Sequence, residues 1–190
     1  MPKPYNHFSR EEFSQRQQKT RKHLQKLELD GLLLFKIEDM YWLTGYESDG
    51  FCIFGSMFIG TDGALTHLAR PADLGNLSYS SICEDVRISP DTEDSTRAEH
   101  IKDMLRSLGM EGKKIGIQVD TMGLTPRLFL EISEILDGWC ELTVAPDFIR
   151  ILRLVKSPQE LNYFRKAGEV MDIVCLLYTS PSPRDGLLSR

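Results

Sequence analysis

The residue types that most often carry chemistry are widely spaced in this sequence. Histidine is a common metal ligand and general base, but no two of the four histidines stand in H-x-H, H-x-x-H or H-E-x-x-H spacing. His67 lies among apolar residues of an expected strand, where a hydrogen-bonded structural histidine is the simplest interpretation. The sequence also has no G-x-S-x-G elbow, Walker loop or G-x-G-x-x-G turn. We therefore expect no catalytic residue, metal ligand or cofactor site in this chain.

The cysteines are scattered as well. Cys52, Cys83, Cys140 and Cys175 include no C-x-x-C pair. Isolated cysteines of this kind are typical of buried thiols in a reducing cytoplasm. A self-contained hydrolase with Cys52 or Cys83 as its nucleophile is an alternative, although no histidine is placed to activate either thiol.

The charge balance argues against two classes of partner. The 190 residues include 23 basic and 28 acidic side chains, so the formal net charge is −5, and neither nucleic acid nor an anionic membrane is expected to bind. Apolar residues make up 41% of the chain, which is enough for a buried core. The N-terminus lacks the basic and then apolar pattern of a secretory signal, and we expect a cytoplasmic protein.

Capping residues and apolar runs predict the elements of the fold. Ser9 and Glu12 form a capping box, which starts a helix that extends to about Leu29. Its basic residues are expected on a solvated face: Arg16, Lys19, Arg21, Lys22 and Lys26. Further helices are predicted over 37–43, 96–108, 125–136 and 148–154, and strands over 31–35, 51–59, 64–69, 86–88, 115–119 and 140–144.

Two of these strands predict a β-hairpin. The runs 51–59 and 64–69 flank an Asp-Gly turn, whose residues tolerate the positive φ that such turns require. Because residues 51–54 are apolar on both faces, the run 51–59 is expected to be a central, buried strand. Strands and helices otherwise alternate. The pattern therefore predicts an α/β fold, a mixed β-sheet with flanking helices.

Three stretches resemble, in order, the N-terminal domains of creatinases and prolidases. "MYWLTGYESDGF" resembles the aromatic–Leu–Ser/Thr–Gly–aromatic signature that follows their first strand. "GKKIGIQVDTMGLTPRLFLEI" resembles their Gly–Ile–Glu strand and the Thr-Pro helix start after it. "FIRILRLVKSPQELNYFRKAGEVMD" resembles the K-S-P-x-E junction that leads into their catalytic half. From about Phe8 to Asp172, the chain is identified as a member of the M24 metallopeptidase family.

The resemblance implies two domains in a longer parent protein. Residues 8–155 would form a creatinase/prolidase-type N-terminal domain with a ribonuclease H-like fold. Residues 156–174 would begin the linker helix into a catalytic domain that is missing here, and that domain would bind two divalent metal ions (Mn, Co or Zn) through two Asp, one His and two Glu. Residues 175–190 contain Ser-Pro-Ser-Pro and resemble translated adaptor sequence, so we expect them to be a foreign, disordered tail.

The function that the resemblance implies belongs to the parent protein. The family comprises Xaa-Pro aminopeptidases, prolidases, creatinases and ectoine hydrolase-like enzymes, so the parent is expected to hydrolyse a peptide or small amide. This domain would build homodimer contacts and wall the active site. Tyr46 and Arg70 are the expected substrate-lining residues: Tyr46 would stack on a substrate ring, and Arg70 would pair with a carboxylate. The alternatives are a core-capping Tyr46, a plain surface Arg70, and a peptide- or protein-binding module without metal ligands.

Overall fold

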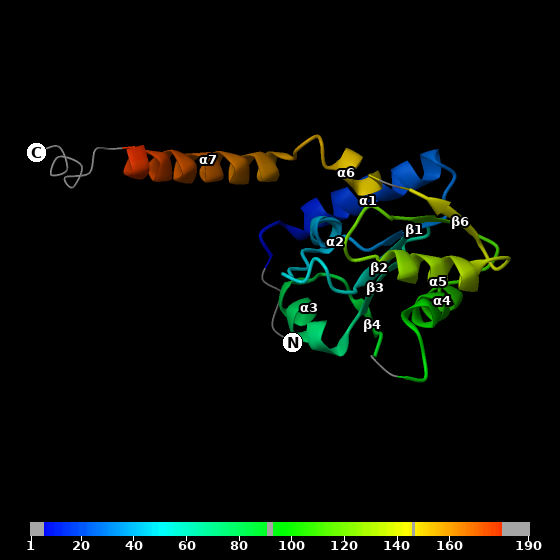
Figure 1. Cartoon of the computed structure of the whole chain (residues 1–190). Helices are drawn as coiled ribbons and strands as arrows, with labels where there is room; N and C mark the ends of the chain where they lie inside the picture. The colour runs from blue at the N-terminus through cyan, green and yellow to red at the C-terminus, as the bar shows by residue number, and fades with distance from the viewer. Residues whose placement is uncertain (1–5, 91–92, 146, 180–190) are drawn as a thin grey trace, which may run out of the picture. The chain divides into compact units, whose positions relative to one another are not determined.

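A computed structural model of the chain describes residues 6–90, 93–145 and 147–179, which fall into two units, residues 1–152 and 153–190. The first unit is a six-stranded mixed sheet with helices on both faces (Figure 1), and the expected fold class is confirmed. Its elements are α1 (Arg10–Lys26), β1 (Gly31–Leu34), α2 (Ile37–Thr44), β2 (Ser56–Gly60), β3 (Leu65–Ala69), η1 (Pro71–Asp73), α3 (Leu74–Ser80), β4 (Asp85–Ile88), α4 (Arg97–Ser107), β5 (Lys114–Ile117), α5 (Pro126–Leu136), β6 (Glu141–Val144) and α6 (Phe148–Leu152).

Five of the six strands point in the same direction. The order across the sheet is β4-β3-β2-β1-β5-β6, in which β2 is antiparallel to β1 and β3 and the remaining pairs are parallel. The carboxyl ends of β1, β3, β4, β5 and β6 therefore meet at one edge, together with the start of β2. We call this the carboxyl edge of the sheet. Ligands of α/β proteins commonly bind just beyond this edge.

The core consists of two apolar layers because alternate residues of a strand face opposite sides of the sheet. On one face, Leu32, Leu34 and Met57 pack with apolar residues of α1, α2, α3 and α6. On the other, Leu33 and Phe58 pack with α4 and α5, which lie together on one side of the sheet in Figure 1. Burial on both faces explains why β1 is a continuous apolar run.

The predicted helix starts are confirmed. The side-chain oxygens of Ser9, Thr96 and Thr125 each accept a hydrogen bond from the backbone N–H three residues later, at 3.2 Å. At Thr96 the reciprocal bond is also present, since the Thr96 N–H donates to the Glu99 carboxylate at 2.6 Å. These local patterns set the entry points of α1, α4 and α5.

Arg16 departs from the expected solvated face of α1. Its side chain is only 4% exposed, and its guanidinium lies 4.1 Å from the ring centroid of Phe8 and 5.4 Å from that of Trp42. Nε donates to Glu12 Oε1 and Nη1 to the Trp42 carbonyl, both at 3.1 Å. The expectation was wrong because a carboxylate, a carbonyl and aromatic faces together replace the water around the guanidinium. The other basic residues of the helix are exposed or half-buried: Lys19, Arg21, Lys22 and Lys26.

The expected strand 51–59 is shorter than its apolar run. β2 begins at Ser56, and residues 51–53 form an exposed turn that the Ile53 N–H closes by donating to the Gly50 carbonyl at 2.9 Å. Burial of Ile53 was therefore a wrong prediction, because apolar composition alone does not determine where strand pairing begins. The central position is confirmed for β2 itself, whose residues are all buried between β1 and β3. The hairpin turn is also confirmed, with Gly63 at a φ of +111°.

The connection from β3 to β4 contains two elements that the sequence did not predict, η1 and α3. Because β3 and β4 are parallel, the chain must cross over the sheet between them. Leu77 of α3 is buried in the core during this crossover. Pro71 at the first position of η1 is the one local helix signal, and the polar composition of the following residues hides the rest.

The second unit contains α7 (Pro158–Thr179), whose predicted capping box is confirmed. The Ser157 N–H donates to Glu160 Oε2 at 2.7 Å, and the Glu160 N–H donates to Ser157 Oγ at 3.2 Å. The helix continues past residue 174, where we expect the native sequence to end. The boundaries at 155 and 174 and the foreign origin of 175–190 stay predictions, and residues 180–190 lie outside the described part of the chain.

Candidate substrate-lining site

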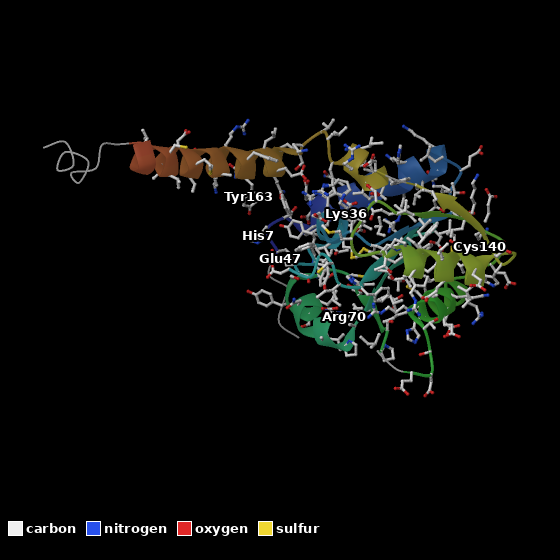
Figure 2. All side chains as sticks on the ribbon, in the orientation of Figure 1. His7, Lys36, Glu47, Arg70, Cys140 and Tyr163 are labelled. Atoms are coloured by element: carbon white, nitrogen blue, oxygen red, sulfur yellow. The ribbon has the colours of Figure 1, made fainter. Side chains whose placement is uncertain are left out.

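The two residues expected to line a substrate, Tyr46 and Arg70, both lie at the carboxyl edge. Tyr46 follows α2 and Arg70 follows β3; Figure 2 labels Arg70, together with Lys36 at the start of α2. Tyr46 and Arg70 line one small pocket with Ser48 and Asp73. The structure therefore brings together two residues that come from separate connections of the sheet.

A left-handed turn positions Tyr46. α2 ends at Gly45, whose φ of +79° suits glycine, and a Cβ added there would lie 2.4 Å from Asn6 Oδ1. The Tyr46 N–H donates to Thr44 Oγ1 at 3.3 Å. Its buried ring lies edge-on to the ring of His67, with 4.6 Å between the centroids.

The chemistry of Tyr46 resides in its hydroxyl. Burial raises the pKa of Tyr46, and the hydrogen bond with the Ser48 side chain opposes this shift. The hydroxyl is therefore protonated at neutral pH and can both donate and accept a hydrogen bond. Because the ring packs in the core, this conformation favours the capping role of Tyr46 over stacking on a substrate.

Arg70 is held by a carboxylate of its own chain. Its Nε and Nη2 donate to Asp73 Oδ2 and Oδ1 at 2.9 and 2.8 Å, which is a bidentate ion pair between two largely buried side chains. Asp73 thus occupies the position in which we expect a substrate carboxylate. A substrate carboxylate would therefore have to compete with Asp73 for the guanidinium. The spacing Arg-x-x-Asp at a helix start is the sequence signal that could have identified this pair.

His67 is buried in β3, at the position where the sequence predicts a hydrogen-bonded structural histidine. The residue is 1% exposed, and Nδ1 has no hydrogen-bond partner among the described residues. Burial lowers the pKa of His67 to about 4, while the charge of Asp73 acts in the opposite direction. The imidazole is therefore neutral at physiological pH and is held by packing against Tyr46.

The pocket between Tyr46 and Arg70 has room for a water molecule and no more. Its volume is about 10 Å³, and residues 50 and 53–55 form part of its wall. A larger ligand would need this loop to move. The lining of the pocket includes the hydroxyls of Tyr46 and Ser48 and the ion pair of Arg70 with Asp73. These residues include no nucleophile with an adjacent base. The site can bind, orient or shield a ligand.

The buried cysteine and the acidic and histidine side chains elsewhere form no reactive site among the described residues. Burial raises the pKa of Cys83 to about 12, which keeps its thiol protonated and poorly nucleophilic. No group of three or more His, Cys, Asp and Glu side chains that could hold a metal ion occurs among the described residues. Within the same ranges, every helix is too short or too polar to cross a membrane.

A family model named creatinase/prolidase N-terminal domain matches residues 16–155. The chain belongs to this family. The match covers the whole sheet and most of both helical layers, and it confirms the family that the sequence stretches indicate.

Two curated relatives of this creatinase/prolidase N-terminal domain are hydrolases by name. The uncharacterised hydrolase/peptidase y4tM of Sinorhizobium fredii is 24% identical over 173 residues, which cover 87% of this chain and 44% of the relative. Ectoine hydrolase of Halomonas elongata is 24% identical over 171 residues, which cover 86% of this chain and 43% of the relative. The chain thus spans less than half the length of each.

The crystal structure of a recombinant prolidase from Thermococcus sibiricus has the same fold. The two superpose with a TM-score of 0.73 at 21% identity, over 90% of this chain and 44% of the prolidase. At this level of identity the likeness extends to the fold alone.

Proposed function

We propose that this chain serves as the N-terminal, non-catalytic domain of a longer M24-type metallohydrolase, in which it helps to form a homodimer and one wall of the active site. The observation that carries the proposal is the convergence of Tyr46, Arg70 and Asp73 at the carboxyl edge. It is supported by the two relatives, which are named hydrolases and of which this domain spans less than half.

The wall would act by positioning a substrate. The Tyr46 hydroxyl is a neutral donor, and the bidentate pair with Asp73 fixes the Arg70 guanidinium at little net charge. Groups held this firmly can restrict the poses of a bound peptide or small amide. Bond cleavage would belong to the rest of the parent, where two divalent ions (Mn, Co or Zn) would activate water. The described residues of this chain do not fit such ions, and we assign it no step that involves them.

The test compares the full-length gene product with the 190-residue chain. We expect the full-length protein to hydrolyse Xaa-Pro dipeptides or an ectoine-type cyclic amide when Mn, Co or Zn is added, and the 190-residue chain to hydrolyse none of them. In the full-length protein, Tyr46→Phe removes only the hydroxyl and should raise KM about 2- to 10-fold, the value of one neutral hydrogen bond. Tyr79→Phe makes the same change at an exposed position of α3 and should leave KM unchanged.

Three results would contradict parts of the proposal. Metal-dependent turnover by the purified 190-residue chain would overturn its non-catalytic role. A full-length protein that binds peptides but hydrolyses nothing with any of the three metals would favour the binding module. A monomeric full-length protein in sedimentation would remove the role in dimer formation.

A further inference from the structure

The two outer strands of the sheet differ in the side chains that they present to a neighbouring chain. β4 and β6 are these strands, and no strand among the described residues pairs with their outer sides (Figure 1). An edge strand carries unpaired N–H and C=O groups, to which a strand of another chain can add. Proteins block such an edge or use it, and the side chains of the strand decide between the two.

The hydrogen bonds to β5 determine which backbone groups of β6 point outward. The N–H groups of Glu141 and Ala145 donate to the carbonyls of residues 113 and 117, both at 2.9 Å. Alternate residues of a parallel strand bond to the same neighbour, so Leu142 and Val144 direct their backbone groups away from β5. β6 thus offers the N–H and C=O groups of these two residues to a further strand.

β6 is self-complementary when two copies pair antiparallel about a two-fold axis. The outward groups of Leu142 would bond those of Val144 in the second copy, and the axis repeats this exchange. The same register puts Leu142 beside Val144 on the face of the sheet that packs with α5. Thr143 would lie opposite Thr143 of the second copy, a kind of pair that stabilises antiparallel strands.

Charge permits this pairing at β6 and opposes it at β4. Glu141, the charged residue of β6, pairs with Lys114 at 3.1 Å and would face Ala145 of the second copy. In β4, the Ser89 N–H donates to a β3 carbonyl at 2.7 Å, so the equivalent register would put Arg87 opposite its own copy. Like charges directly opposite each other destabilise a strand pair. The sequence of β4 therefore blocks self-pairing, and that of β6 does not.

β6 also borders apolar surface that a second strand would cover. A pocket of about 230 Å³ is lined by α5 and β6, and its apolar residues include Phe129, Leu136, Leu142 and Val144. Val144 is 50% exposed although it belongs to a strand. Figure 2 labels Cys140, which lines the same pocket just before β6. A neighbouring strand at this edge would remove part of this surface from water.

We propose that β6 pairs with β6 of a second copy of this chain, which joins the two sheets into one continuous sheet. The inference rests on the homodimer of the proposed function and assigns its contact to one strand. Pairing of a four-residue strand buries much less area than a standard interface. We therefore expect the 190-residue chain to dimerise weakly, with half of the chains dimeric at about 0.1–1 mM.

Disulfide trapping tests the register. The background replaces the cysteines that are not buried by serine: Cys52, Cys140 and Cys175. Thr143→Cys would place two thiols in a non-hydrogen-bonded pair with Cα atoms about 4.5 Å apart, a spacing that suits a disulfide. Glu141→Cys is at a more exposed position, but its Cα atoms in the two copies would lie about 14 Å apart. On mild oxidation, Thr143→Cys should yield at least about 10-fold more covalent dimer than Glu141→Cys.

Proline tests the backbone hydrogen bonds. Val144→Pro removes an outward N–H that β5 does not use, so β6 should stay in the sheet. The dimer dissociation constant should rise at least about 10-fold, because the two-fold axis removes this bond twice. Ile88→Pro makes the matched change on β4 and should leave the dimer unchanged. Thr143→Lys keeps every N–H group but opposes like charges, and it should also give a monomer. Sedimentation at about 0.5 mM measures all three variants, and circular dichroism checks that each is folded.

Four outcomes would overturn the proposal. Equal trapping of Thr143→Cys and Glu141→Cys would mean that the chains meet only by random collision. A dimer that survives both Val144→Pro and Thr143→Lys would form through another surface, such as the exposed apolar residues of α7. A wholly monomeric 190-residue chain at about 0.5 mM would show that β6 does not pair. A full-length dimer that Thr143→Cys does not trap would exclude pairing through β6 and leave the homodimer of the proposed function intact.

Discussion

Mild acid should destabilise this domain through one buried histidine. His67 is 1% exposed, and burial lowers its pKa to about 4, compared with about 6.5 in an unfolded chain. The groups around it are the ring of Tyr46 and the carboxylate of Asp73, whose charge opposes the shift without cancelling it. Between the two pKa values the unfolded chain binds a proton that the native domain excludes. The contribution of His67 to the free energy of unfolding is therefore largely present above about pH 6.5, and it decreases as the pH falls toward 4.

The size of the effect follows from the two pKa values. The difference between about 6.5 and about 4 corresponds to about 3 kcal/mol of unfolding free energy, most of which is lost by pH 4 and the rest below it. About 2 kcal/mol of this should be lost between pH 7 and pH 5. That window lies above the range in which ordinary carboxylates titrate, so the histidine can be measured largely by itself.

The measurement is urea unfolding at pH 7, 6 and 5 on the wild type and two variants. His67→Leu removes the titrating group from an apolar environment. The free energy of unfolding of this variant should change by less than about 0.5 kcal/mol between pH 7 and pH 5. His7→Gln removes an exposed histidine that pairs with Glu47 and should keep the wild-type loss. The reasoning fails if the wild type loses less than about 0.5 kcal/mol, or if His67→Leu shows the same pH dependence as the wild type.

Four further substitutions test the packing and one helix cap by urea unfolding at pH 7. Ile53→Asp, at a position that is 38% exposed, should cost less than about 1 kcal/mol, whereas Phe58→Ala in the centre of β2 should cost about 3–5 kcal/mol; equal costs would place Ile53 in the core. Arg16→Ala should cost about 3–5 kcal/mol because it leaves Glu12 buried without its partner, and a cost below 1 kcal/mol would contradict the buried ion pair. Thr96→Ala should cost about 1 kcal/mol through loss of the cap of α4, and no cost would mean that the cap contributes nothing.

The features that could be predicted from the sequence are those determined by local interactions. The caps at Ser9, Thr96 and Thr125 are predictable because the backbone N–H that each side chain accepts from lies only three residues later in the sequence. β1 is predictable because burial on both faces leaves a continuous apolar run. The burial of the Arg16 side chain was not predictable, because it depends on contacts with Trp42 of another helix, α2.

The candidate site likewise combines features that the local sequence indicates with features that depend on contacts between distant elements. The positions of Tyr46 and Arg70 follow from an expectation about where loops leave the sheet, and they do line one pocket. The Arg-x-x-Asp spacing identifies the pair of Arg70 and Asp73 only where a helix start is recognised, and η1 was not predicted from the sequence. The pocket lined by Arg97 of α4 and Arg127 of α5 could not be predicted, because no local pattern brings these two helices together.

The mixed topology explains why two pockets, one lined by Tyr46 and Arg70 and the other by Arg97 and Arg127, occur at one edge of the sheet. Five strands point toward the carboxyl edge, and β2 begins there, so the connection from α2 to β2 must pass in front of the neighbouring strand ends. Residues 52–55 of this connection line both pockets between them, and Phe54 belongs to each. A change at Phe54 should therefore disturb both pockets together. Tyr46→Phe instead alters the pocket of the proposed substrate wall alone, which is why it tests that wall more cleanly than a change at Phe54.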